Sequence, residues 1–374
     1  MARILAAAGD PGGAAALLPV MRGLAEAGHQ LTAIAGQPAA RMFADAGFAC
    51  APSTGSWADH VALAGATAAA EKPDVALVAT GMLAGVDAAL ARTGKRLGIP
   101  TVCVLDAWVN YRNRFICPDD MMMLPSTIPD VITVMDDFTV REMVDLGFPP
   151  AVLHVVGQPA FDVWIEQSSS PMWARMQAAA RRALRVRDDE RLVVFFSQPL
   201  DSDYGPSGSP LHRGYDQHTA FTALQQAIAA LNPRPRLVIK PHPREAAGAY
   251  DQTGAGSTDS YHVVPSTGES ISTYSLTAAA DLVVSMTSIT LVQAMLVGTP
   301  IISLQPGLRV DDANVLGRMG ITLPVTDVSV LPSAITSGLA KSGQDVRSRL
   351  PQTWTDGRST ARTMAVIEHL AKDY

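Results

Sequence analysis

The amino-acid sequence predicts an α/β protein of two Rossmann-like domains whose parallel sheets face each other across a cleft. Short apolar runs alternate with helical segments along the chain, as parallel βαβ units require. The alternation restarts after a polar, basic stretch near residue 170. The 374 residues also exceed what one ordinary core accommodates. We therefore expect an N-terminal domain over residues 1–168 and a C-terminal domain over residues 169–374.

Composition narrows the class of protein. Hydrophobic residues make up 48% of the chain and charged residues 17%, which is typical of a compact globular protein. The net charge of −6 and the lack of a dense Lys/Arg run exclude a nucleic-acid partner. Only Cys50, Cys103 and Cys117 are present, without metal-ligand spacing, so we expect free thiols and a cytoplasmic protein. Peripheral association with a membrane and the oligomeric state are left open.

The first predicted element is a strand over Arg3–Ala8, followed by Gly9-Asp-Pro-Gly-Gly13 and an apolar helix. Glycines such as Gly12 and Gly13 let backbone amides approach a ligand, and a helix N-terminus favours anionic or hydroxyl-rich groups. The turn lacks the G-x-G-x-x-G pattern of dinucleotide-binding domains. A nicotinamide cofactor is therefore disfavoured.

Four further strands are predicted in the first half, and each is bounded by turn residues. They cover Gly28–Ala35, Asp74–Thr80, Pro100–Leu105 and Val131–Met135, and the apolar run Val152–Val156 then leads into Gly157-Gln-Pro. Asp106 follows one of these strands directly, and Trp108, Asn110, Tyr111 and Arg112 come next. Aromatic faces and planar polar groups are the chemistry of sugar recognition. The alternative is that Trp108 and Tyr111 belong to the core and that the arginines are solvated.

The second half repeats the pattern. Strands are expected at Leu192–Phe196, Leu237–Ile239, Asp281–Ser285 and Gly298–Ser303, with helices over Thr219–Leu231 and Ile289–Val297. The strand at Leu237 runs into Lys240-Pro-His-Pro-Arg-Glu245. Prolines on both sides of His242 restrict the backbone, so the imidazole is held at low entropic cost. We expect His242, with Lys240, Pro243 and Arg244, to contact a negatively charged ligand; the alternative is a solvated structural turn.

A second polar group follows the strand at Asp281. Ser285, Thr287 and Ser288 lie where this strand becomes a helix, and hydroxyls beside free amides form an anion site. One Ser or Thr at this position is also the usual N-cap. Three hydroxyls together favour a phosphate, and Gln198, after the strand at Leu192, is expected to join them.

These motifs resemble those of nucleotide-sugar enzymes with GT-B architecture. The resemblance rests on Gly157-Gln-Pro-x-x-Asp162, Lys240-Pro-His-Pro243, Thr287-Ser288 and Gly298-Thr-Pro-Ile301. The His-Pro and Ser/Thr pair is similar to bacterial sialyltransferases and polysialyltransferases, and more distantly to CDP-glycerol polymerases. This resemblance implies a CMP- or CDP-activated donor whose phosphate contacts His242 and the hydroxyls.

Two departures from known families remain. An acidic base motif followed by Gly, expected for the sialyltransferases, is absent, which leaves Asp10 and Asp106 as candidate bases. The motifs also resemble those of non-hydrolysing UDP-N-acetylglucosamine 2-epimerases. Here the early Arg-Pro-Glu of that family is missing, and Ser285-Met-Thr-Ser288 replaces its Asp-Ser-Gly-Gly. The epimerase is therefore the second hypothesis.

The first hypothesis is an inverting glycosyl transfer from a CMP-sugar, such as a nonulosonate, or a UDP-sugar to a hydroxyl of a glycan, glycolipid or small molecule. Asp10 or Asp106 would act as the base, and His242 would stabilise the leaving phosphate. No metal or further cofactor is expected, because adjacent acids such as Asp136 and Asp137 point in different directions. A third hypothesis is a nucleotide-sugar-binding protein without catalysis.

Overall fold

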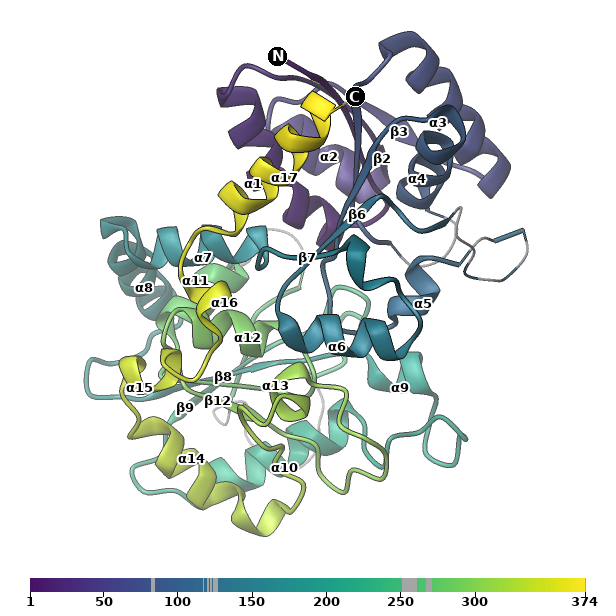
Figure 1. Cartoon of the computed structure of the whole chain (residues 1–374). Coiled ribbons are helices and arrows are strands. Elements are labelled where there is room, and N and C mark those ends of the chain that lie inside the picture. Colours follow the sequence, from purple (N-terminus) through teal and green to yellow (C-terminus); the bar gives the residue numbers. More distant parts are fainter. Residues whose placement is uncertain are drawn as a thin grey trace. The chain divides into compact units, whose positions relative to one another are not determined.

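The computed structural model describes residues 1–373 except 82–84, 117, 120, 122, 124–126, 251–260 and 267–270. The chain divides into two compact units. Unit 1 comprises Met1–Val163 and the chain from Pro351 onward, and unit 2 comprises Trp164–Leu350. Figure 1 follows the chain by colour from purple to yellow. Each unit contains one parallel sheet with helices between its strands, which confirms the predicted α/β class with two Rossmann-like sheets.

The sheet of unit 1 has the strand order β3-β2-β1-β4-β5-β6-β7, and neighbouring strands are parallel. Its strands are β1 (Arg3–Ala8), β2 (Gln30–Gly36), β3 (Cys50–Ser53), β4 (Val75–Val78), β5 (Thr101–Val104), β6 (Val131–Val134) and β7 (Leu153–Val155). Strand β3 was not predicted, because it is short, partly exposed and contains a proline, which a sheet tolerates at an edge.

The helices of unit 1 connect these strands. They are α1 (Pro11–Glu26), α2 (Gln37–Asp45), α3 (Trp57–Glu71), α4 (Val86–Leu97), α5 (Tyr111–Arg114), α6 (Asp137–Asp145), η2 (Pro150–Val152), α16 (Gln352–Thr355) and α17 (Ser359–Asp373); α7 (Pro159–Ser168) contains the boundary between the units. Several begin at an acidic cap: the Asp10 side chain accepts from the N–H of Gly13, and Asp136 from that of Thr139.

Unit 2 has the strand order β10-β9-β8-β11-β12, again parallel throughout. Its strands are β8 (Leu192–Phe196), β9 (Arg236–Lys240), β10 (His262–Val263), β11 (Leu282–Ser285) and β12 (Ile301–Ser303). Its helices are α8 (Pro171–Ala183), α9 (Leu200–Tyr204), α10 (Gln217–Ala229), α11 (Thr273–Ala279), α12 (Ile289–Leu296), α13 (Val315–Arg318), η3 (Val328–Val330), α14 (Leu331–Leu339) and α15 (Gly343–Arg347).

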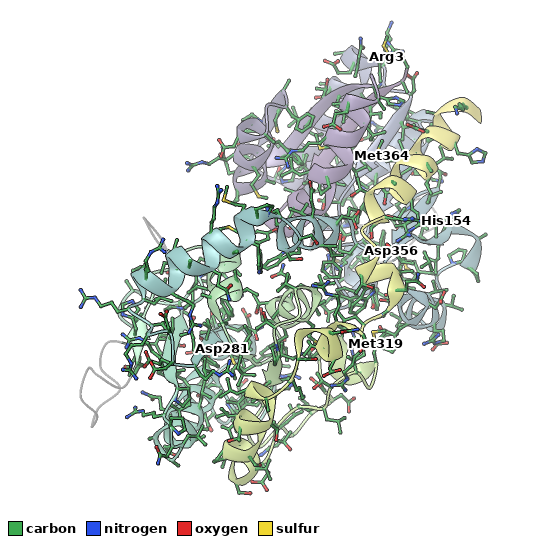
Figure 2. The ribbon with its side chains drawn as sticks, turned by 90° about the vertical axis from the view of Figure 1, so that its left-hand side faces the viewer. Arg3, His154, Asp281, Met319, Asp356 and Met364 are labelled. Atoms are coloured by element: carbon green, nitrogen blue, oxygen red, sulfur yellow. The ribbon has the colours of Figure 1, made fainter. Side chains whose placement is uncertain are left out.

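The basic helix that marked the expected domain boundary is part of unit 2. Arg181 of α8 donates to Asp281 at 3.1 Å and to the backbone carbonyls of Ala279 and Glu190. Asp281, labelled in Figure 2, also accepts from Arg191 and from the N–H of Leu192, both at 2.8 Å. This carboxylate therefore joins the start of β11 to the start of β8 and fastens α8 to the same edge of the sheet.

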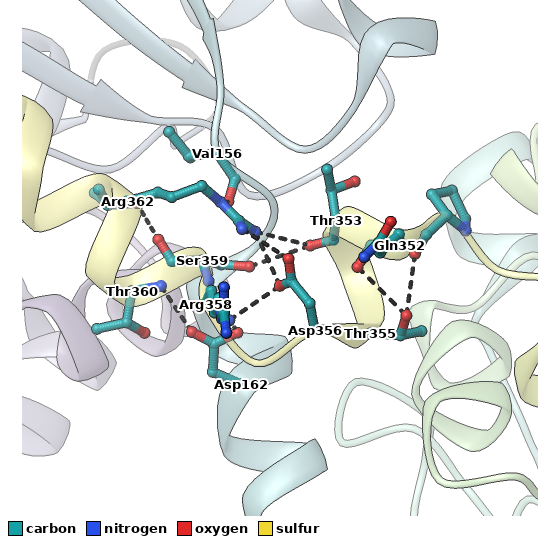
Figure 3. Close-up of polar contacts among 12 residues, drawn as sticks. Val156, Asp162, Gln352, Thr353, Thr355, Asp356, Arg358, Ser359, Thr360 and Arg362 are labelled. Atoms are coloured by element: carbon teal, nitrogen blue, oxygen red, sulfur yellow. Dashed lines mark hydrogen bonds and ion pairs between the residues drawn. The ribbon is translucent and has the colours of Figure 1, made fainter.

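The last part of the chain departs from the expected division, because residues from Pro351 onward belong to unit 1 and not to the C-terminal domain over 169–374. Helix α17 lies alongside α1 (Figure 1). Its first amides, on Ser359 and Thr360, donate to Asp162, and Arg362 is paired with Asp356 at 2.7 Å (Figure 3). The two contacts of Asp162 link residues about 200 positions apart, which local sequence patterns do not reveal.

A buried carboxylate holds the short helix α16 in place. The indole of Trp354 donates to Asp136 at 3.0 Å, and Trp108 donates to the same oxygen at 2.8 Å. Asp136 is 4% exposed and Trp354 is fully buried. The rings of Trp108, Phe161 and Trp354 pack together, with the two indole centroids 4.7 Å apart. This aromatic cluster fixes the C-terminal segment to unit 1.

Two further observations complete the fold. Cys50 and Cys103 are free thiols, and Cys117 lies outside the described residues. In the described part of the chain, every helix is too short or too polar to cross a lipid bilayer.

Trp354→Ala is expected to lower the free energy of unfolding of unit 1 by about 3 to 5 kcal/mol, because it leaves a large cavity and removes one donor from a buried carboxylate. Urea denaturation followed by circular dichroism measures the change. Trp173→Ala, at a partly exposed position on α8, is the control and should change stability far less. Equal losses in the two variants would contradict this account of the C-terminal segment.

Candidate active site

In both units, the strand order changes direction between two neighbouring strands. In unit 1 this occurs between β1 and β4, and in unit 2 between β8 and β11. In open parallel sheets, ligands bind outside the carboxyl ends of the strands at such a switch point, because the loops there separate. Asp10, Gln198 and Thr287 follow strands at these switch points, whereas Asp106 and His242 follow the next strands, β5 and β9. Each unit is described separately below.

The turn after β1 brings a carboxylate to the first switch point. Asp10 is partly buried, and its Oδ1 accepts from the N–H of Gly13 at 2.8 Å, so this acid caps α1. A Cβ on Gly12 would lie 3.0 Å from Asp106 Oδ2 and 3.4 Å from Asp10 Oδ1. The glycine expected to admit a ligand thus lies against both candidate bases, and Gly13 is needed because a Cβ there would meet Ala79 at 2.6 Å.

Asp106, which follows β5, lies in an environment that shifts its pKa. Its Oδ1 accepts from Arg114 at 2.7 Å and from the Thr80 hydroxyl at 2.8 Å, and its side chain is 11% exposed. Burial raises the pKa of Asp106 above its ordinary value, and Arg114 and Thr80 oppose that shift. Arg114 was not predicted as a site residue, and it also donates to the carbonyl of Thr80 at 2.6 Å.

A third carboxylate, Asp87 near the start of α4, was missed. It is 1% exposed, and one of its oxygens accepts from the N–H of Gly81. Burial raises its pKa to about 6, and the charge of Asp10 adds to the effect. A charged residue among Val86, Ala88 and Ala89 was a usable signal, because acids rarely enter an apolar helix face without a reason.

Two of the predicted sugar contacts belong to the core, as the alternative interpretation held. Trp108 is 3% exposed and donates to Asp136, and Tyr111 is 4% exposed and donates to Glu142 at 2.8 Å. Both are corrections to the predicted acceptor site. Asn110 and Arg112 are exposed; Asn110 has a φ of +59° and precedes the short helix α5. Their proposed role in binding an acceptor stays a prediction.

In unit 2, the turn after β9 fixes the orientation of His242. Its Nδ1 accepts from the N–H of Arg244 at 3.1 Å, and its own N–H donates to Glu245. Because Nδ1 accepts a hydrogen bond, the proton of the neutral ring lies on Nε2. Burial lowers the pKa of His242, and the charge of Arg244 lowers it further. At neutral pH His242 is therefore a neutral donor through Nε2.

Glu245 supports this turn and was not predicted as a site residue. Its Oε1 accepts from Ser197 at 2.8 Å and from Tyr250 at 2.6 Å, and its Oε2 accepts from the backbone of His242. Ser197 and the hydroxyl of Tyr250 also lie 2.6 Å apart. The network joins the end of β8 to the end of β9. Its only sequence signal was an acid at the end of the Lys240 motif.

The two cations of this turn have protein partners. The ammonium of Lys240 donates to the carbonyls of Pro265 and Ile271, and burial lowers its pKa. Arg244 forms a two-pronged pair with Asp203, at 2.7 and 2.9 Å. Pro243 is exposed. Lys240 and Arg244 therefore support the loops around His242, and direct contact of either cation with a donor stays a prediction.

The three hydroxyl-bearing residues after β11 make different contacts. The Ser285 hydroxyl donates to the carbonyl of Phe196 at 2.6 Å and is fully buried, so we remove it from the proposed contacts. Ser288 caps α12 through the N–H of Thr290 at 3.2 Å, which is the alternative interpretation of this motif. Gln198 Oε1 accepts from the N–H of Thr287 at 2.8 Å, and its Nε2 donates to the Thr287 hydroxyl at 3.3 Å.

Strand order sets how close the predicted residues of unit 2 come. His242, Gln198 and Thr287 follow β9, β8 and β11, which are neighbours in the sheet. Strands lie about 4.8 Å apart, so the turns after β9 and β11 are separated by roughly 10 Å across β8. That spacing is compatible with a diphosphate and its neighbouring groups. The His242 turn and the Thr287 helix start thus lie at the same end of the sheet. Their convergence on one phosphate pocket stays a prediction.

The fold is of the GT-B type, with two Rossmann-like domains. It matches solved UDP-GlcNAc 2-epimerases from Methanocaldococcus jannaschii (15% identity, TM-score 0.71, 98% of this chain and 99% of that chain) and Neisseria meningitidis, bound to UDP-GlcNAc (12%, 0.71, 99% and 100%). It also matches the glycotransferase of kitacinnamycin (15%, 0.63, 99% and 99%). At these identities the likeness establishes the fold. No family model and no curated protein matches the sequence.

The pKa of Asp87 predicts a pH-dependent stability. Its folded value of about 6 lies above an unfolded value of about 3.9, so the folded chain binds the proton more tightly. Ionisation of Asp87 lowers the free energy of unfolding. This loss is absent below pH 4, grows as the pH rises through 6, and then stays constant near 3 kcal/mol. Relative to Asp87→Asn, the native protein should lose about that much unfolding free energy between pH 4 and 7.

Urea denaturation of both proteins at several pH values measures this difference. The comparison with Asp87→Asn cancels the opposite trend of Asp130 and Asp356, whose hydrogen bonds and cationic partners lower their pKa values. A constant difference between the two proteins over that pH range would contradict the assignment of a raised pKa to Asp87.

Proposed function

We propose that this chain is an enzyme that acts on a nucleoside-diphosphate sugar, with hydrogen-bond donors for a diphosphate in unit 2 and candidate proton-transferring carboxylates in unit 1. The observation that carries the proposal is the placement of complementary chemistry at the carboxyl ends of the two sheets, at the switch points and the strands beside them. Unit 2 has neutral donors there, from His242, Thr287 and the start of α12. Unit 1 has the carboxylates Asp10 and Asp106 there.

In unit 2, the donors suit a phosphate that gains charge as its bond to the sugar breaks. The Nε2–H of His242 is held by the Arg244 and Glu245 contacts, so it requires little reorganisation when the charge develops. The amino end of α12 adds the positive end of a helix dipole. Gln198 orients Thr287 and so fixes the loop that carries this helix start.

In unit 1, Asp106 is the better candidate for the base. Asp10 Oδ1 is engaged in capping α1, whereas the pKa of Asp106 is raised by burial toward the range in which a carboxylate accepts a proton efficiently. Arg114 keeps the carboxylate oriented through Oδ1. A Cβ on Gly12 would lie 3.0 Å from Asp106 Oδ2, so a glycine at this position keeps side-chain atoms of the turn after β1 away from that oxygen.

The reaction we favour is inversion at C2 of a UDP-N-acetylhexosamine. Support comes from the full-length structural likeness to UDP-GlcNAc 2-epimerases, one of them bound to UDP-GlcNAc. A C2 proton of a sugar is not acidic by itself, and its removal becomes feasible when the diphosphate leaves C1 and a C1–C2 double bond forms. The epimer then results when a proton is delivered to the opposite face of C2 and the retained diphosphate bonds to C1 again. Such a reaction needs a base for the proton and donors for the departing diphosphate, and no metal or cofactor enters the proposal.

Glycosyl transfer to a hydroxyl acceptor is the second candidate. It is supported by the likeness to the glycotransferase of kitacinnamycin and by the missing Arg-Pro-Glu and Asp-Ser-Gly-Gly motifs. The same base would then remove the proton of the acceptor hydroxyl. The two epimerase structures named above carry UDP-GlcNAc in their descriptions, and none of the three structures names CMP or a sialyltransferase, so a UDP-sugar replaces the CMP-sugar as the first choice.

Thermal denaturation with UDP, UDP-GlcNAc and CMP tests the choice of nucleotide. A ligand present at 100 times its dissociation constant stabilises by about 2.7 kcal/mol, which shifts the melting temperature of a domain of this size by roughly 5 to 10 °C. We expect such a shift with UDP and UDP-GlcNAc and a much smaller one with CMP. A larger shift with CMP would overturn the UDP assignment and favour the sialyltransferase-like hypothesis.

Product analysis by NMR then separates the reactions. Inversion at C2 of UDP-GlcNAc without an acceptor supports the epimerase, and UDP release that depends on an added acceptor supports the transferase. Binding of UDP-GlcNAc without either reaction would support the non-catalytic hypothesis.

His242→Ala should lower kcat about a hundred- to thousandfold, because it removes a preorganised donor to the leaving diphosphate. His262→Ala is the matched control: it lies in the same unit on edge strand β10, and burial also lowers its pKa. Turnover at saturating substrate and urea denaturation should be measured for both variants. Unchanged turnover in His242→Ala would rule out the proposed role of this ring.

A further inference from the structure

Asp87 occupies a space that three glycines leave for it. They come from three segments: Gly9 follows β1, Gly81 follows β4 and Gly85 precedes α4. A Cβ on Gly9 would lie 3.1 Å from the Asp87 carboxylate and one on Gly81 2.7 Å from it, and a Cβ on Gly85 would overlap it. The local chain is thus shaped around this carboxylate, although a smaller neutral residue would cost less to bury.

One oxygen of this carboxylate lacks a protein partner. Among the described residues, Oδ1 of Asp87 is buried without a hydrogen bond, whereas Oδ2 accepts from Gly81. Asp87 lines a cavity of about 30 Å³ together with Thr80, Cys103 and Arg114. This volume is enough for water, since one molecule requires about 10 to 15 Å³. A buried carboxylate with incomplete hydrogen bonding is destabilising, which points to a use of its charge.

A short path joins Asp87 to Asp106. The Thr80–Gly81 peptide donates its N–H to Asp87, while the Thr80 carbonyl accepts from Arg114 at 2.6 Å. Arg114 and the Thr80 hydroxyl both donate to Asp106 Oδ1. The carboxylates are therefore bound to adjacent residues of one loop. The charges of Asp87 and Asp106 both raise the pKa of the Cys103 thiol on β5, in addition to the effect of burial.

We propose that Asp87 is a positioning residue that acts on Asp106 through the Thr80–Gly81 loop, where its buried negative charge makes Asp106 a stronger base. This inference rests on the role proposed above for Asp106. Arg114 donates to Asp106 and opposes the effect of burial on the pKa of that carboxyl, whereas the charge of Asp10 raises the pKa of both Asp106 and Asp87. Two like charges at a short distance in a poorly solvated site favour proton binding by one of them.

The groups that act on Asp87 and Asp106 come from several elements. Asp10 lies on the turn after β1, Cys103 on β5, and Arg114 on α5. Together they leave the site with more carboxylates than cations. Replacing Asp87 by Asn keeps an oxygen that can accept from Gly81 and removes the charge. The effect on Asp106 is then electrostatic and does not require a change of fold.

The first test is the ¹³C NMR titration of the Asp106 carboxyl, assigned by its loss in Asp106→Asn. In Asp87→Asn, we expect the midpoint of Asp106 to move to lower pH. The control is Asp130→Asn, which removes a hydrogen-bonded carboxylate at the amino ends of β5 and β6. An unchanged or higher midpoint in Asp87→Asn, with the control also unchanged, would overturn the inference.

The second test is the pH dependence of kcat/KM for UDP-GlcNAc turnover. Because a weaker base reacts more slowly, Asp87→Asn should lower kcat/KM about three- to tenfold at pH 7.5 and move the acid limb of the profile to lower pH. A uniform loss at every pH would indicate a merely structural role and count against the proposal. A shifted Asp106 midpoint in a protein without turnover would support the coupling and overturn the proposed function instead.

Discussion

The parallel pairing of all strands is the constraint on which both sites depend. In a parallel sheet every strand ends at the same edge, so the segments that follow β1, β4 and β5, or β8, β9 and β11, meet there whatever their distance in sequence. The change of direction in strand order then separates neighbouring loops and leaves room at that edge. Asp10 and Asp106, or Gln198 and His242, are brought together by this geometry and not by any local motif.

Polar residues near these edges serve the fold and the chemistry at the same time. Asp10 and Ser288 cap helices, and Ser285 fastens β11 to β8, although all three were candidate ligand contacts. Lys240 and Arg244 hold loops in the same way. Side chains such as Ser285, whose hydrogen bonds are made within the protein, therefore position the few side chains that keep a donor or acceptor for a ligand. His242 and Asp106 belong to the second group.

The sequence predicted the strands of both sheets well, because each buried parallel strand is a short apolar run between turn residues. It also located Asp106, His242 and Thr287 at strand ends. It assigned Trp108 and Tyr111 to a sugar site, because residue type alone cannot distinguish an aromatic residue that donates to a buried carboxylate from one that stacks on a ligand. Asp87 and Glu245 were missed because their partners lie in other segments.

The separate course of the C-terminal segment has a consequence for synthesis on the ribosome. Unit 2 is one continuous stretch, so it can complete its core once Leu350 has emerged. Unit 1 begins the chain but still needs Trp354 against Asp136 and α17 against α1. Until those last residues emerge, the nascent N-terminal half exposes the apolar surface of α1 that α17 later covers. The N-terminal half is therefore synthesised first but completes its folding last. It is the half that would depend on chaperones until α17 has been synthesised.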